Sequence, residues 1–274
     1  MKLSIVTDHC TRLLSVFPLP KGYQVIEQGC YHYVLNGKAQ AIAEPWVKAR
    51  NPQGQLLTHS GRFVDEQQLV LLVSHLTKPA DNNGQHRPSL PGSFASEIRW
   101  QQAGLADISA HYQFCQQQKR LSIALKSDTG PLSIHEMRPE PFAYFPLLRV
   151  FSGQVIQSLA LSGPLPTLVP DIHDPANRSA LLMPIQNTRS AKQLAAEVIH
   201  LAGRQYHTQR YQYLSERYQQ QNDAAFWIDS TGLLLKYCWQ QNPDSLWQVG
   251  LHAHQIMAFL PGVITEDQPP CSRT

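Results

Sequence analysis

The sequence predicts a mainly β protein, an antiparallel lipocalin-like barrel or strongly curled sheet with one packing helix. The main evidence lies in the last quarter of the chain, where runs rich in Tyr, Trp, Val, Leu and Thr alternate with polar turn clusters. A second observation is Asn36-Gly37 between two strand-like runs, which is the strongest short-range hairpin signal. A third is the alternation of apolar and polar residues over 121–126, which is typical of a strand with one wet face.

The first half of the chain is expected to form a meander after a lead-in over residues 1–22. The segment 78–92 is rich in Pro, Asn and Gly and is expected to be a long polar loop. Strands are expected over 23–35, 38–48, 55–64, 69–76, 94–101, 108–116, 121–126 and 132–137.

The pattern changes after Pro139, where a dense apolar segment shows no clean alternation. Pro146 suits the first turn of a helix, which we expect around residues 144–160. Residues 164–175 are expected to be irregular because of their prolines, and strands are expected over 179–185 and 195–201 before the C-terminal meander. We therefore predict one β domain over 23–265, with two β halves split near residue 139 as the alternative. A polar, disordered tail is predicted over 266–274.

Composition narrows the class of protein. A chain of 274 residues that is 42% hydrophobic can bury a substantial core without metal or disulfide support. The net charge of +3 is small and the basic residues are scattered, so we expect no nucleic-acid partner. No uncharged apolar run approaches the roughly 20 residues of a membrane span.

The cysteines and the N-terminus indicate a compartment. The five cysteines are odd in number and form no CxxC pair, which argues against a metal knuckle or a disulfide framework. Thr7-Asp8-His9 interrupts the first apolar run, so no secretory leader is expected and the cytoplasm is the simplest location. We expect no cofactor, and a homodimer is left open.

The C-terminal motifs carry a family resemblance. Gly203-Arg204-x-Tyr206 is followed by Phe226-Trp227-Ile228-Asp229-x-x-Gly232-Leu233-Leu234, and Gly29 to Lys38 is a weaker echo of a first hairpin. This pattern resembles uncharacterised bacterial β-rich families that are similar in outline to lipocalin-like and lipoprotein-carrier sheets. The resemblance implies a sheet that curls around an apolar ligand. It implies a structural role for Asp229, Gly232 and Trp227, and no catalytic residue.

Two short clusters could carry chemistry. His252-Ala253-His254 places two imidazoles two residues apart, on one face of a regular strand, but a third metal ligand is missing nearby. We assign no metal and take His252 as a catalytic candidate and His254 as a ligand-binding one; the alternative is two polar side chains on a strand face. In His135-Glu136-x-Arg138, Glu136 is a candidate general base whose pKa would be raised by burial. The alternative is an exposed salt bridge at a strand end.

No G-x-S-x-G, P-loop, Rossmann or HExxH motif occurs in the sequence. The functional prediction therefore depends mainly on the aromatic residues. Tyr237 is the third catalytic candidate. Rings inside a curled sheet suit a bulky apolar ligand when they are taken as a group, although core packing is the better explanation of any single ring. The predicted ligand-binding rings are Trp100, Tyr112, Tyr144, Tyr211, Tyr213 and Trp239.

Two functions of different classes follow from these expectations. The first is a cofactor-independent enzyme, an isomerase or cyclase that acts on a hydrophobic small molecule in the pocket. The alternative is a non-catalytic binding or carrier protein for a lipid-like ligand. A third option, a structural or interaction module, would have a filled core.

Overall fold

The computed structural model describes residues 3–65, 68–77, 92–127, 130–201, 203–215 and 224–257. The expected loop over 78–92, apart from Gly92, and the expected tail over 266–274 lie outside these ranges. The strands in the described part are β1 (Gln24–Leu35), β2 (Lys38–Arg50), β3 (Leu56–Val64), β4 (Gln68–Thr77), β5 (Phe94–Trp100), β6 (Ile108–Cys115), β7 (Arg120–Ser127), β8 (Gly130–Met137), β9 (Ala143–Tyr144), β10 (Leu165–Pro170), β11 (Pro184–Leu201), β12 (Arg204–Ser215), β13 (Ala225–Ile228), β14 (Leu234–Asn242) and β15 (Ser245–Ile256).

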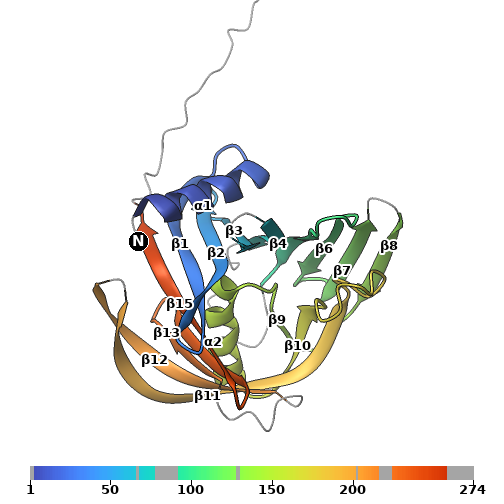
Figure 1. Cartoon of the computed structure of the whole chain (residues 1–274). Coiled ribbons are helices and arrows are strands. Elements are labelled where there is room, and N and C mark those ends of the chain that lie inside the picture. The colour runs from blue at the N-terminus through green and yellow to red at the C-terminus, as the bar shows by residue number, and fades with distance from the viewer. Residues whose placement is uncertain are drawn as a thin grey trace, which may run out of the picture.

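These strands form one 15-stranded sheet that consists of two meanders. The first strand of the chain pairs with the last and so joins the two meanders. β1 to β8 follow one another, β9 to β15 follow one another, and β1 pairs with β15. All neighbours are antiparallel except β9 and β10. The edges are β8 and β9, so the sheet curls strongly without closing (Figure 1). The mainly β prediction is confirmed in its curled-sheet form.

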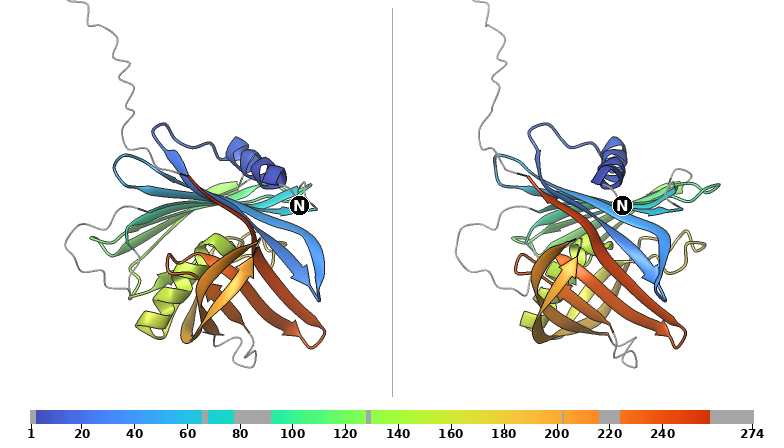
Figure 2. Two further views of the ribbon diagram at one scale, coloured as in Figure 1. Left: turned by 90° about the vertical axis from the view of Figure 1, so that its left-hand side faces the viewer. Right: turned by 60° about the vertical axis from the view of Figure 1, so that its left-hand side comes forward.

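The predicted helix is present inside the curl, but it begins later than expected. A short 3₁₀ segment, η1 (Arg149–Phe151), leads into α2 (Ser152–Ser162). Ile156 and Leu159 lie three residues apart on one helical face and are buried. Gly163, with φ of 79°, ends the helix by donating its N–H to the Leu159 carbonyl. Figure 2 shows α2 within the curl.

A second helix covers the outside of the sheet, where the sequence had suggested only a lead-in. α1 (Leu3–Val16) packs on β1, β2 and β3. Cys10, Leu13 and Phe17 recur at helical spacing and are buried against Cys30 and Val47 of the sheet. The apolar run alone does not indicate a helix, because Thr7-Asp8-His9 interrupts it. A helix that packs on a sheet needs an apolar stripe on one face only.

Two strand assignments also need correction. Residues 165–170 form β10 although Pro166 and Pro170 had suggested an irregular segment. The prolines are tolerated because β9 pairs with β10 only at Thr167 and Leu168, which leaves most of that side without a ladder. The two strands expected over 179–185 and 195–201 are replaced by the continuous β11, which has a register shift between Gln193 and Ala196.

The turn between β13 and β14 has the structural role that the family resemblance implied. Oδ1 of Asp229 accepts the N–H groups of Thr231 and Leu233, both at 2.9 Å, and Gly232 has φ of 84°. A Cβ atom on Gly153 would collide with the carbonyl oxygen of Gly232. Glycine at position 153 therefore lets α2 lie directly against this turn.

Candidate functional site

The concave face of the sheet contains an open cleft of about 580 Å³. It lies over the neighbouring sheet strands β3, β2, β1, β15 and β14, beside η1. Polar and apolar side chains both line it: Tyr33, Ile42, Arg62, Arg149, Tyr213, Ala224, Tyr237, Trp239, Gln241 and Trp247.

A continuous stack of aromatic rings borders the cleft, and Tyr237, Trp239 and Trp247 of this stack line it. The centroid of Tyr237 lies 4.2 Å from Phe226 and 4.7 Å from Trp239, and Trp239 lies 5.5 Å from Trp247. Strand register produces this stack, because Tyr237 and Trp239 alternate along β14 while Phe226 and Trp247 are their direct neighbours on β13 and β15. The rings that line the cleft therefore give this wall of the cleft an apolar, aromatic surface.

A guanidinium group lies on this wall. Cζ of Arg149 is 4.7 Å from the centroid of Tyr237 and 5.6 Å from that of Trp239, within cation–π range. Burial on its own would lower the pKa of Arg149, but Tyr33, Tyr237 and Glu44 raise it above its ordinary value. Arg149 is therefore a permanent positive charge at the edge of the cleft.

Glu44 holds the positive charges in place from within the protein. Its side chain has no exposed surface, and it lies 2.6 Å from Nη2 of Arg62 and 2.8 Å from the backbone N of Arg149. The Tyr33 hydroxyl also donates to it at 2.5 Å. Burial would raise the pKa of Glu44, but Arg62 and Arg149 bring it below its ordinary value. The carboxylate is ionised and fully engaged, and its two arginines leave the site with a net positive charge.

The backbone before Arg149 is strained. Leu147 and Leu148 have φ of 66° and 57°, a region that residues with a Cβ rarely adopt. Both leucine side chains are buried in the main core, and this packing holds the conformation. The strained pair directs the first N–H of η1 at Glu44. The position of Arg149 is therefore set by packing, strain and a charged acceptor together.

A smaller cavity of about 160 Å³ adjoins the cleft. Arg149, Tyr213 and Tyr237 line both spaces. The remaining lining residues of the smaller cavity come mainly from α2 and the neighbouring strands: Phe145, Ser152, Val155, Ile156, Arg189 and Phe226.

The structure brings some of the predicted rings to the cleft and leaves others in the core. Tyr213, Tyr237 and Trp239 line the cleft. The others lie elsewhere: Tyr211 and Tyr112 are core residues, with the Tyr112 hydroxyl bonded to the Leu182 carbonyl, Trp100 packs against the core from β5, and Tyr144 lines a separate cavity of about 200 Å³.

The His252 and His254 side chains do not converge, contrary to the expectation of a shared face. A register shift opposite Cys30 and Tyr31 interrupts the alternation of β15. The His252 ring lies 4.5 Å from that of His32, whereas Nε2 of His254 lies 2.7 Å from Oε1 of Glu27. Neither histidine lines the cleft.

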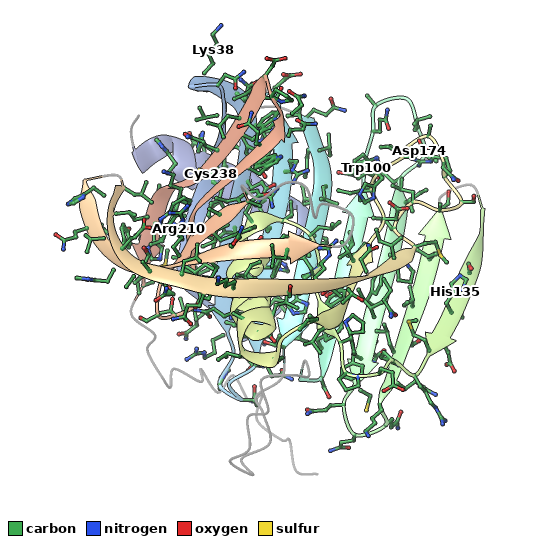
Figure 3. All side chains as sticks on the ribbon, turned by 90° about the horizontal axis from the view of Figure 1, so that it is seen from below. Lys38, Trp100, His135, Asp174, Arg210 and Cys238 are labelled. Atoms are coloured by element: carbon green, nitrogen blue, oxygen red, sulfur yellow. The ribbon has the colours of Figure 1, made fainter. Side chains whose placement is uncertain are left out.

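Glu136 is not buried, contrary to the expectation that burial would raise its pKa. Its side chain is 57% exposed and forms a 3.8 Å ion pair with Arg120. Figure 3 shows its neighbour His135 on the edge strand β8, across the molecule from Cys238 on β14. The exposed salt bridge considered as the alternative describes this position.

The sequence reading missed four residues of the site: Tyr33, Glu44, Arg62 and Arg149. A usable signal exists for two of them. Glu44 stands alone as a charge within the apolar run 41–47, and Arg149 stands alone within 147–151. A single charge in an otherwise buried segment needs a partner, which is a reason to search for one.

Comparisons with known proteins add little about function. No protein-family model and no curated protein matches the chain. Among solved structures, it is similar to the crystal structure of a β-barrel-like protein of the domain of unknown function DUF1849 from Brucella abortus. The TM-score is 0.45 with 10% sequence identity, over 85% of this chain and 98% of that one. A likeness at this level carries no functional argument.

Membrane-spanning helices are not found in the described ranges. α1 has 14 residues and α2 has 11, and neither combines the length and the apolar content of a span.

Proposed function

We propose that the protein binds a hydrophobic small molecule in the open cleft and acts as a non-catalytic carrier or binding protein. The four-ring stack formed by Phe226, Tyr237, Trp239 and Trp247 is the observation that supports this proposal. Stacked rings on one wall of a cleft of about 580 Å³ suit a flat or acyl body of a small ligand.

An isomerase or cyclase is the second candidate. It retains Tyr237 in the cleft, but Glu136 and His252 lie elsewhere in the fold. The carboxylate of Glu44 contacts residues that line the cleft. It is ionised and is occupied by Arg62, by the backbone N–H of Arg149 and by Tyr33. A general base must be free to take a proton from the substrate, so we favour binding over catalysis.

Titration with N-phenyl-1-naphthylamine, a neutral fluorescent aromatic probe, tests the proposal. We expect its emission to rise on binding and its affinity to fall about tenfold in Trp239→Ala, because one of the two indole rings of the stack is removed. Leu246→Ala is the matched control, since Leu246 is an exposed residue next to Trp247 on β15. Absence of binding to the native chain, or equal affinity in both variants, would contradict the proposal.

Native mass spectrometry after incubation with a metabolite extract separates the two candidates. A small molecule retained unchanged supports the carrier, and a conversion without change of mass supports the isomerase. A cytoplasmic location and a homodimer remain parts of the proposal that cell fractionation and sedimentation would test.

A further inference from the structure

The smaller cavity beside the cleft collects hydrogen-bond donors. Arg149, Ser152 and Arg189 line it, and they come from η1, the first turn of α2 and β11. The other lining residues are Tyr213, Tyr237 and the apolar Phe145, Val155, Ile156 and Phe226. No carboxylate is among the described residues that line this space.

Two of these donors lack an acceptor within the described chain. Ser152 is 4% exposed, and its hydroxyl oxygen has no hydrogen-bond partner there. Nε of Arg189 is equally buried without a partner, although Cζ of this side chain lies 5.6 Å from the centroid of the Tyr213 ring. Buried polar groups in native proteins are nearly always satisfied, so two unpartnered donors at one cavity indicate that an acceptor binds between them.

The charge of the cavity identifies the kind of acceptor. Two guanidinium groups line it, while Glu44 interacts with Arg149 through the backbone N–H and does not line this space. The apolar walls lower the local dielectric constant, which strengthens attraction to a negative group. Guanidinium forks and a hydroxyl are the donors that proteins use for carboxylate and phosphate oxygens.

The cavity also adjoins the cleft. Arg149, Tyr213 and Tyr237 line both, so the head group and the body of one ligand would share these three contacts. The volumes are about 160 Å³ and about 580 Å³, which fits a small head group joined to a larger body.

We infer that the smaller cavity binds the oxyanion head group, a carboxylate or a phosphate, of an amphipathic ligand whose apolar body lies on the aromatic wall. This inference rests on the proposed binding function and specifies the ligand class. Arg189 and Ser152 supply the donors at the head group, and Arg149 connects the head-group site to the ring stack.

Displacement of N-phenyl-1-naphthylamine by three twelve-carbon compounds tests the inference. The competitors are dodecanoate, dodecyl phosphate and dodecanol, which share a chain and differ in the head group. We expect at least one of the two acids to displace the probe about tenfold better than the alcohol. The stronger acid then identifies carboxylate or phosphate as the natural head group.

Variants of the two donors make the test specific. Arg189→Gln should remove most of the preference for acids, measured as the ratio of displacement by each acid to displacement by dodecanol, a ratio in which any change of probe affinity cancels. Arg189→Lys should restore part of the preference, and Ser152→Ala should weaken it about threefold. Arg120→Gln removes an exposed guanidinium and is the charge-matched control.

The outcomes separate the two proposals. Probe binding with equal displacement by all three compounds, or an acid preference that persists in Arg189→Gln, would overturn the head-group site and leave the binding function intact. A native chain that does not bind the probe would overturn both.

Discussion

The two faces of the sheet at β1 have different environments: one borders the cleft and the other is covered by α1. Along β1, Tyr33 faces the cleft, whereas Cys30 faces α1 and is part of the outer core. The outer face is sealed, since Leu13 has no exposed surface and Phe17 stacks on His59 with centroids 5.3 Å apart. The inner face borders the open cleft, beside the buried carboxylate of Glu44.

The placement of the two helices explains this difference. α1 lies along the outside of β1, β2 and β3 and fills that surface with its apolar stripe. α2 is held at the other side of the curl by the contact of Gly153 with Gly232 and by β11, so it leaves the space next to β14 and β15 uncovered. We expect the outer face to govern stability alone, and the inner face to govern stability and binding together.

The largest effect is expected from removing the buried charge. Glu44→Gln leaves Arg62 and Arg149 without their counter-ion and should lower the free energy of unfolding by about 3–5 kcal/mol. Urea unfolding measures this change. Glu136→Gln is the matched control, and its exposed ion pair should contribute at most about 1 kcal/mol. Equal losses in the two variants would remove the distinction between the buried and the exposed pair.

A core deletion under α1 should reduce stability without affecting the cleft. Leu13→Ala creates a cavity at a fully buried position and should cost about 2–4 kcal/mol in urea unfolding. Affinity for N-phenyl-1-naphthylamine should not change at a temperature where the variant is folded. A parallel loss of probe affinity would show that the two faces are coupled.

Acid should weaken the outer face through His59. Burial lowers the pKa of His59 from 6.5 to about 4. The unfolded imidazole gains a proton as the pH falls below 6.5, while the folded one stays neutral to about pH 4. The stabilisation is therefore complete above pH 6.5 and is lost on the way down to pH 4, by about 3 kcal/mol for this residue.

Substitution isolates that contribution. Neither ring nitrogen of His59 has a hydrogen-bond partner among the described residues, so His59→Leu should retain stability at pH 7. Unfolding by urea at pH 7 and pH 4.5 should then show a smaller difference in the variant than in the native chain. An unchanged difference would assign the acid sensitivity to other groups.

The smallest effect is expected from one hydroxyl in the inner network. Tyr33→Phe removes a donor to Glu44 and an acceptor that lies 3.3 Å from Nε of Arg149. The expected cost is about 1–2 kcal/mol, measured by thermal or urea unfolding. Tyr23→Phe removes a hydroxyl that donates to Oε1 of Gln55 at 3.3 Å, outside this network, and is expected to cost less. A larger loss in Tyr23→Phe would contradict the importance of the inner network.

Sequence reasoning predicted the parts of this site that depend on local pattern. Tyr237 and Trp239 are two residues apart in an evident strand, and alternation alone puts them on one face. The same argument failed for His252 and His254, because a register shift in β15 depends on pairing with β1. The sequence around Glu136 indicates a strand but not whether the side chain is buried. Its exposure follows from the position of β8 at the edge of the sheet.

The sequence by itself determined the β class, the hairpins and the ring-bearing strand faces, because turn chemistry and alternation are local properties. Only the tertiary structure decided that the sheet stays open, that α1 seals one face, and that Glu44 meets Arg149 from 105 residues away. Such meetings depend on how the whole sheet curls and where α2 lies within it. No short stretch of sequence encodes that geometry.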